Sequence, residues 1–147
     1  MSLLVDIEKR LGNFMLRSKF EASSGTMALL GASGCGKSVT LRCIAGIMTP
    51  DSGRIVLDGE TLFDSEKHID LPPQKRRVGY LFQQYALFPS MTAEQNILCC
   101  IRSGTRAEKR RALAEAVRMF RLEGLEKKLP AQLSGGQQQR VALSRIL

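Results

Sequence analysis

The stretch Gly31-Ala32-Ser33-Gly34-Cys35-Gly36-Lys37-Ser38 decides the fold of this 147-residue chain. It fits the pattern G-x-x-x-x-G-K-[ST] in full and predicts a loop that cradles phosphate groups. Glycines let backbone N–H groups turn inward and let the chain approach a ligand closely. Lys37 can reach the phosphates as a point charge, and Ser38 offers a hydroxyl to Mg²⁺.

The glycine-rich loop lies between a predicted strand and a predicted helix, as a phosphate-binding loop requires. Residues 26–30 form a short apolar run that predicts a buried strand, and Leu41 and Ile44 recur at helical spacing after the loop. The helix would point its N-terminus, with an effective charge of about +0.5, at the phosphates. Val39 lacks a hydroxyl but keeps its backbone N–H. Cys35 would place a thiol beside the phosphates.

A second glycine-containing motif, Leu133-Ser134-Gly135-Gly136-Gln137, opens the last helix. Ser134 is a good N-cap, and Gln137 completes a capping box. The two glycines leave the first turn bare, so a second phosphate group could approach its N–H groups. A plain helix start would have a similar sequence. The pairing of the two motifs, separated by a strand and a helical insert, is far more specific than either motif alone.

The strand signals predict an α/β fold with a mainly parallel sheet. Residues 3–7 and 14–20 read as two strands around a Gly-Asn turn, and residues 54–57 and 61–63 form a second hairpin around Asp-Gly. Residues 78–82 predict another buried strand.

Helices are expected after Pro89. Thr92 with Gln95, and Thr105 with Glu108, fit capping boxes. A helical stripe that predicts core packing follows at Leu113, Val117 and Phe120.

The composition is that of a globular protein, with 44% apolar and 24% charged residues. No apolar run approaches the roughly 18–20 residues that cross a bilayer, and the N-terminus lacks the features of a signal peptide, so we expect a cytosolic location. The net charge of +8 suits nucleic acid, a membrane surface or a polyanionic phosphate, and does not decide between them.

The cysteines give no metal-site pattern. They form no CxxC pair, and His68 is the only histidine, so we expect reduced thiols without a structural metal. The four positions are Cys35, Cys43, Cys99 and Cys100.

Together the two motifs resemble those of ABC transporter ATPases, with a Walker A loop and an LSGGQ signature. The likeness covers essentially the whole chain. It implies a P-loop NTPase core with N-terminal antiparallel strands and a helical subdomain. We expect one domain in three parts: a β-rich and phosphate-loop core at residues 1–84, a helical subdomain at 85–133 and the signature helix at 134–147.

The resemblance implies ATP and Mg²⁺ as cofactors. It also implies that Lys37 and Gln83 are catalytic and that Ser38 and Gln83 bind Mg²⁺. Phe14 would stack on the adenine ring. Gln83 could instead be a surface residue after a strand, and Phe14 a core residue. The implied nucleotide-binding residues are Phe14, Gly31, Ala32, Ser33, Gly34, Cys35, Gly36, Lys37, Ser38 and Val39. In a head-to-tail dimer, the partner's γ-phosphate would meet Leu133, Ser134, Gly135, Gly136 and Gln137.

Importers are the closest class by resemblance. Residues 85–89 and 92–97 are similar to the surface that receives coupling helices from membrane subunits. Leu11-Gly12-Asn13-Phe14 and residues 72–80 most resemble molybdate or tungstate importers, although sulfate, sugar and polyamine importers share the second stretch. The implied partners are a second ATPase subunit, transmembrane permease subunits and, indirectly, a substrate-binding protein, with no nucleic acid. The implied location is the cytoplasmic face of the membrane.

By this resemblance, the Walker B aspartate, the catalytic glutamate and the switch histidine would follow residue 147. We therefore expect an incomplete central sheet, weak Mg-ATP binding and negligible hydrolysis by these residues alone. Two other readings stay open. A DNA-associated ABC ATPase would suit the basic charge, but the interval between the motifs is compact. A truncated, non-enzymatic remnant is also compatible with the residues.

Overall fold

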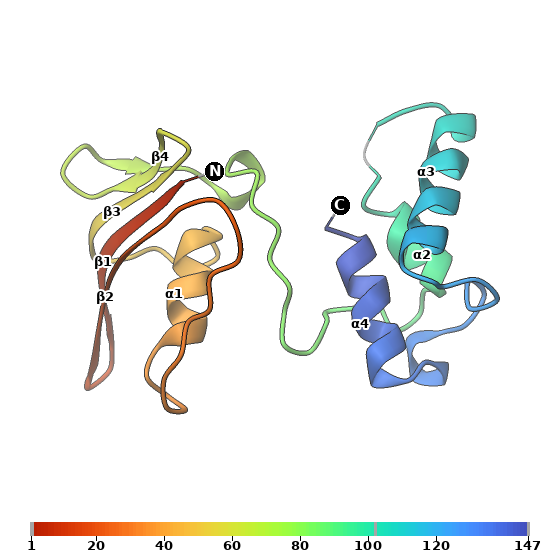
Figure 1. Cartoon of the computed structure of the whole chain (residues 1–147), viewed down its shortest axis with the longest axis horizontal. Coiled ribbons are helices and arrows are strands. Elements are labelled where there is room, and N and C mark those ends of the chain that lie inside the picture. The colour runs from red at the N-terminus through yellow and green to blue at the C-terminus, as the bar shows by residue number, and fades with distance from the viewer. Residues whose placement is uncertain (1, 102, 147) are drawn as a thin grey trace. The chain divides into compact units, whose positions relative to one another are not determined.

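The computed structural model describes residues 2–101 and 103–146 and divides the chain into two compact units. The first unit runs from Met1 to Tyr80 and the second from Leu81 to Leu147. Figure 1 shows the strands and α1 in the first unit and the other α-helices in the second.

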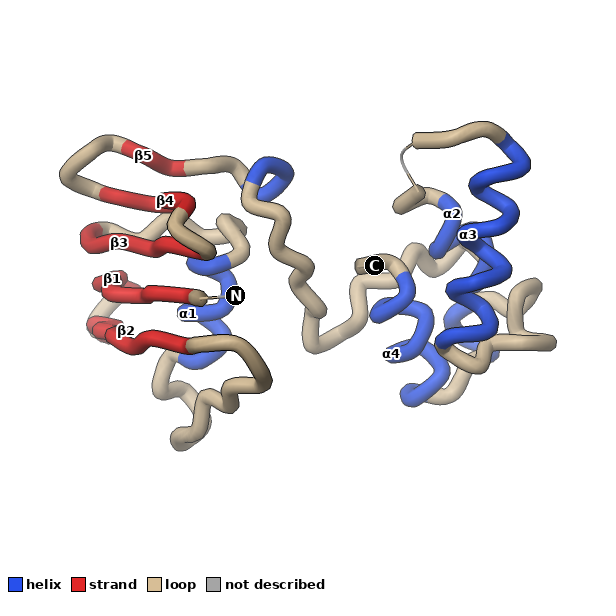
Figure 2. Tube along the Cα trace, turned by 45° about the horizontal axis from the view of Figure 1, so that its top comes forward, coloured by secondary structure: helices blue, strands red, loops and turns tan. Residues whose placement is uncertain are grey.

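The first unit is built on a five-stranded sheet with the order β2-β1-β3-β4-β5 (Figure 2). Every ladder within it is antiparallel. The pairs β1–β2 and β3–β4 are joined by tight turns, which connect antiparallel neighbours. The strands are β1 (Leu3–Leu11), β2 (Phe14–Ala22), β3 (Ser52–Leu57), β4 (Glu60–Asp64) and β5 (Ile69–Asp70).

One face of this sheet packs on α1 (Lys37–Ile44), the helix that follows the glycine-rich loop. In β1, Val5 and Ile7 are buried at the period of two that a strand with one core face requires. Val5 is paired across the sheet with Ile55, and both belong to the core that α1 covers. The buried members of this core are Val5, Ile7, Cys43, Ile44, Ile55, Leu62 and Phe63.

Two strand predictions and the parallel sheet are wrong for the described chain. Residues 26–30 and 78–82 have no regular secondary structure, and no strand of the sheet includes them. Leu30 is 92% exposed, although its apolar run predicted burial. Apolar composition favours burial, but a strand forms only where a neighbouring segment pairs with it. Within the described residues, the segments that pair do so as antiparallel neighbours in β1 to β5.

The second unit is helical, as predicted for the chain after Pro89. Its elements are α2 (Ala93–Leu98), α3 (Arg106–Met119), a 3₁₀ turn at Pro130–Gln132 and α4 (Gly135–Ser144). A further 3₁₀ turn lies in the first unit at Pro73–Lys75. Each of α2, α3 and α4 begins with a complete capping box, which confirms all three that the sequence predicted.

A separate apolar core joins these helices. The predicted stripe on α3 faces it: Val117 is buried, and Leu113 and Phe120 pack beside it. Its buried members are Ala93, Ile97, Val117, Leu122, Leu133 and Val141. None of the helices in the described ranges is long and apolar enough to cross a membrane.

Candidate nucleotide-binding site

The glycine-rich loop folds as its sequence requires. Gly34 and Gly36 have φ values of 84° and 97°, which a residue with a side chain rarely adopts. A Cβ on Gly36 would also lie 2.5 Å from Cδ1 of Leu16. Gly36 is therefore fixed both by its backbone conformation and by the strand β2 beside it.

The helix that follows this loop starts without a side-chain cap. Gly36 occupies the N-cap position of α1, and the first turn holds no acidic residue. Within residues 2–101 and 103–146, no group accepts from the backbone N–H of Lys37, Ser38 or Val39. Three donors and the positive end of the helix dipole are thus directed at one place, which is the arrangement that binds phosphate.

The ammonium group of Lys37 lies within the loop. Its Nζ donates to the carbonyl oxygens of Gly31 and Ala32, each at 2.7 Å, and lies 3.5 Å from Sγ of Cys35. The ammonium group is therefore held against the Gly31–Cys35 segment of the loop that leads into α1. A phosphate oxygen that reached this ammonium would replace a neutral carbonyl partner by a charged one, which gives the stronger hydrogen bond.

The other loop residues differ in what they can offer a ligand. Ala32, Ser33 and Ser38 are exposed, and Ser38 carries its hydroxyl on the first turn of α1. The side chain of Val39 is half-buried and packs on the core of the first unit, so only its backbone amide remains available. Cys35 is an exposed free thiol.

Phe14 lies beside the loop. It is the first residue of β2, its ring is 40% exposed, and Cε1 lies 3.5 Å from where a Cβ of Gly36 would be. The structure therefore brings Phe14 and the phosphate loop together. An exposed ring at this position is available for stacking on a flat base.

Arg76 holds the opposite end of α1, and sequence reasoning missed it. Its side chain is fully buried. NH1 donates to the carbonyls of Cys43 and Ile44 at 2.7 and 3.1 Å, Nε donates to Leu71 O, and NH2 pairs with Asp70 at 2.7 Å. Burial lowers the pKa of the Arg76 guanidinium, and the Asp70 carboxylate opposes this. Arg76 lies in a polar loop, and nothing in the neighbouring sequence indicates that its side chain contacts Cys43, 33 residues earlier.

The second motif lies in the second unit at the start of α4. Ser134 Oγ accepts from Gln137 N at 3.3 Å, and Gln137 Oε1 accepts from Ser134 N at 2.8 Å. Positions for a Cβ on Gly135 and Gly136 have no atom within 4 Å, so the glycines leave an open surface. Leu133 is buried and anchors the motif in the helical core.

Gln83 also belongs to the second unit, in a turn rather than at a strand end. It is exposed, and the turn continues through Tyr85 and Ala86, whose φ values are 59° and 47°. Asn96 fixes the chain that follows: its Oδ1 accepts from Phe88 N at 2.8 Å, and its Nδ2 donates to Phe88 O and Met91 O. This buried asparagine was not predicted, because its partners are loop carbonyls with no sequence signal.

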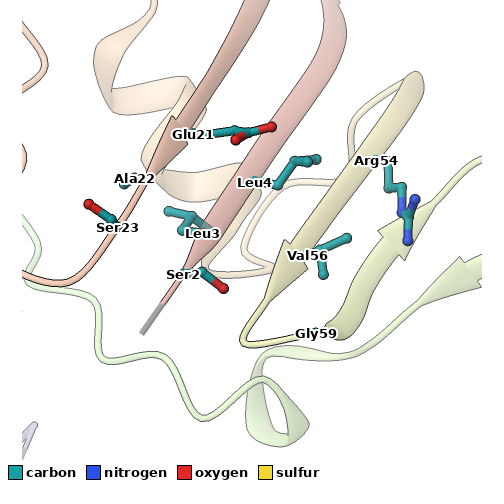
Figure 3. A pocket seen from close by; sticks show the side chains of 9 residues that line it. All are labelled: Ser2, Leu3, Leu4, Glu21, Ala22, Ser23, Arg54, Val56 and Gly59. Atoms are coloured by element: carbon teal, nitrogen blue, oxygen red, sulfur yellow. The ribbon is translucent and has the colours of Figure 1, made fainter.

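Figure 3 shows a pocket formed by the strands of the first unit, at the end where β1 begins. Its lining includes Leu3 from β1, Glu21 from β2 and Arg54 from β3. None of the residues predicted to bind nucleotide lines this pocket. The phosphate loop is instead an open surface, and we assign the pocket no role.

A glycine-rich loop that opens an uncapped helix against a sheet defines a P-loop nucleotide-binding protein. The chain belongs to the ABC transporter family, whose model matches residues 17–147. This agrees with the resemblance seen in the two sequence motifs.

Several import ATP-binding proteins are similar to this chain. The molybdenum import ATP-binding protein ModC of Paramagnetospirillum magneticum is 41% identical over 143 residues, which are 97% of this chain and 39% of the relative. The molybdate/tungstate import ATP-binding protein WtpC of Archaeoglobus fulgidus is 43% identical over 147 residues, 100% of this chain and 59% of the relative. The chain therefore spans about two fifths of the length of this ModC and somewhat more of WtpC.

A solved structure shares the fold. The ATP-binding cassette MJ0796, in a dimeric post-hydrolysis state bound to ADP and Pi, matches with a TM-score of 0.77 and 30% identity. The match covers 100% of this chain and 69% of the cassette. The chain thus has the ABC cassette fold.

Proposed function

We propose that this chain is the nucleotide-binding part of an ABC importer ATPase for molybdate, tungstate or a similar oxyanion. The observation that carries the proposal is the uncapped start of α1, whose first three amides have no acceptor among the described residues, together with the Lys37 ammonium in the loop before it. The relatives named above support the importer class and the oxyanion. Importers of sulfate, sugars or polyamines remain the second candidate, because residues 72–80 resemble theirs as well.

The cofactors proposed are ATP and Mg²⁺. The amides of Lys37, Ser38 and Val39 and the Lys37 ammonium would bind the β- and γ-phosphates, and Phe14 would stack on the base. The Ser38 hydroxyl is a suitable ligand for Mg²⁺, which takes its other oxygens from phosphates and water. Gln83 is proposed to act at Mg²⁺ from its turn. The ion would neutralise charge on the transferred phosphate.

We propose weak Mg-ATP binding and negligible hydrolysis for these 147 residues by themselves. Residues 2–101 and 103–146 contain no cluster of three side chains able to hold a metal ion. Phosphoryl transfer in this class needs a carboxylate on Mg²⁺ and a group that positions water. Ser38 and Gln83 supply no carboxylate for Mg²⁺.

The partners proposed are a second ATPase subunit and the permease subunits of an importer. In a head-to-tail dimer, the open face at Gly135 and Gly136 would meet the γ-phosphate held by the partner's loop. The turn after Gln83 and the chain fixed by Asn96 would face the permease, on the cytoplasmic side of the membrane. A substrate-binding protein would deliver the oxyanion to the permease.

The test is nucleotide binding by the Lys37→Ala variant, measured by calorimetry with Mg-ATP. Loss of hydrogen bonds from a charged group costs about 1.5–3 kcal/mol, so binding should weaken roughly tenfold to a hundredfold. The matched control is Lys67→Ala. Lys67 is an exposed lysine of the same unit that lies outside the phosphate loop. We expect it to bind like the parent.

Equal affinity in Lys37→Ala and the parent would contradict the proposed site. ATP turnover above background that disappears in Lys37→Ala would contradict the proposal that these residues do not hydrolyse ATP. As a second readout, bound ATP should slow alkylation of Cys35, whose thiol lies beside the Lys37 ammonium. Salt-sensitive binding to duplex DNA would favour the DNA-associated class instead.

A further inference from the structure

Two adjacent cysteines in the helical unit lie outside everything that the proposed function uses. Cys99 is the C-cap of α2 and is exposed; Cys100 follows it and is half-buried. Their Sγ atoms are 3.8 Å apart. Both sulfurs point at the same acceptor, the carbonyl oxygen of Asn96, at 3.1 and 3.8 Å. The two thiols therefore converge on one side of the chain.

The backbone that holds the thiols is well ordered by hydrogen bonds. Cys99 N donates to Gln95 O and Cys100 N donates to Ile97 O, so the helix tightens into a 3₁₀ turn at its end. The Asn96 side chain is buried and donates to three carbonyls. On the far side of Cys100, Arg145 Nε donates to its sulfur at 3.5 Å. The pair is thus presented in a fixed geometry.

A direct disulfide suits this pair poorly. Consecutive Cα atoms lie about 3.8 Å apart across a trans peptide, whereas ordinary disulfides span roughly 4.4–6.8 Å between Cα atoms. An atom that bonds to both sulfurs leaves them at a non-bonded separation, closer to the 3.8 Å observed. Thiol sulfur is a soft ligand and selects soft, thiophilic elements.

Beside Cys100, but not lined by Cys99, lies a cavity of about 400 Å³ within the second unit, whose polar lining is Glu115, Ser144 and Arg145. It could receive a small apolar group attached to the atom that bridges the sulfurs. Most of its lining is contributed by Ile97, Ile101, Ala112, Ala116, Met119 and Phe120.

We propose that Cys99 and Cys100 form a chelating dithiol site for trivalent organoarsenicals with a small apolar substituent. An arsenoxide condenses with the two thiols: two As–S bonds form, the arsenic–oxygen bond breaks, and the two thiol protons leave with the oxygen as water. Neither arsenic nor sulfur changes oxidation state. Partial desolvation of the Cys99 sulfur, and then its hydrogen bond with Cys100, raise the pKa of this thiol.

The test treats the full chain with phenylarsine oxide in excess glutathione and measures intact mass and free thiols. We expect one phenylarsenic group per chain and the loss of two free thiols. The adduct should resist glutathione, a monothiol, and should be removed by dithiothreitol. Closing the second bond within one molecule strengthens binding by about 10²- to 10⁴-fold. Cys99→Ser and Cys100→Ser should each lose affinity by that factor.

The matched control is the double variant Cys35→Ser, Cys43→Ala, which keeps only the adjacent pair and adds no polar group to the core. It should bind phenylarsine oxide like the parent, because Cys35 is separate from the pair and Cys43 is buried. The proposal is overturned if the parent forms no glutathione-resistant adduct, if either single variant of the pair binds as tightly as the parent, or if the double variant loses the adduct. Since Cys99 is exposed, its replacement by serine also tests the site without disturbing the core.

Discussion

The helices α1 and α4 both begin beside glycines, yet they are held at opposite ends. At α4, Ser134 and Gln137 satisfy each other's backbone amides. At α1, no side chain caps the start, and Arg76 instead binds the carbonyls that end the helix. A helix whose first amides serve an external anion cannot use a cap there, so its anchor lies at the far end.

The other α-helices of the described chain are capped in the same way as α4. Three of the four α-helices in the described chain, α2, α3 and α4, start with a complete capping box. The exception is the helix that follows the phosphate loop. The missing cap is therefore a local feature of the proposed binding site and not a property of helices in this chain.

The largest expected effect comes from removing the anchor of α1. Arg76→Met removes the guanidinium that donates to the carbonyls of Cys43, Ile44 and Leu71. Cys43 O keeps the amide of Gly46, but the other two carbonyls lose this donor inside the fold, so the free energy of unfolding should fall by about 3 kcal/mol. Urea unfolding followed by circular dichroism measures this. Nucleotide binding should weaken as well, because the rear of the loop helix is then free to move.

The control for that variant is Lys75→Met, one residue earlier in the chain. Lys75 is exposed, so its loss should leave unfolding close to the parent. A fall of less than about 0.5 kcal/mol for Arg76→Met, which is typical of a surface substitution, would show that α1 does not depend on this anchor.

A smaller effect is expected at the capped helix. Ser134→Ala removes the side chain that accepts from Gln137 N, so the free energy of unfolding should fall by about 1 kcal/mol. Ser134→Asn, which can cap in the same way, should recover most of that loss. If both variants unfolded like the parent, the cap of α4 would contribute nothing to stability.

The smallest expected effect is a difference between the N-terminal caps of α3 and α4 in how their contribution to stability depends on pH. In α3 the cap partner is Glu108, whose pKa is lowered from its ordinary value of 4.5, first by the backbone N–H of Thr105 and then by the Thr105 hydroxyl. Because the folded pKa is the lower one, this cap's contribution is complete above pH 4.5 and is lost as pH falls through the folded pKa. In α4 the partner is Gln137, which does not titrate.

Glu108→Gln should therefore remove that part of the acid dependence of unfolding, giving α3 the same type of cap as α4. The check is a comparison of urea unfolding for the variant and the parent between pH 3 and pH 6. An NMR titration of Glu108 at or above its ordinary pKa would contradict the assignment.

Local features were predictable from the sequence. The turn residues between the strands, the three capping boxes and the glycine-rich loop each depend on contacts within a few residues. For that reason the sequence predicted the hairpins β1–β2 and β3–β4, the start of α1 and the helices after Pro89, and the structure contains them.

Long-range pairing was not predictable in the same way. Residues 26–30 have the composition of a buried strand, but composition does not identify a partner for their backbone, and the described sheet provides none. Arg76 and Asn96 were missed for a related reason. Each satisfies backbone carbonyls of other segments, and a carbonyl partner has no side-chain signature in a sequence.

The anchoring of α1 by Arg76 also connects the phosphate loop to the order of protein synthesis. Arg76 lies 33 residues beyond Cys43, so a ribosome delivers the loop and its helix well before the residue that holds them. At about 5–20 residues per second, the delay is roughly 2–7 s. During that time a nascent chain carries a complete glycine-rich motif whose helix has neither a cap in front nor an anchor behind. Such a chain has the phosphate-binding sequence before it has the phosphate-binding structure.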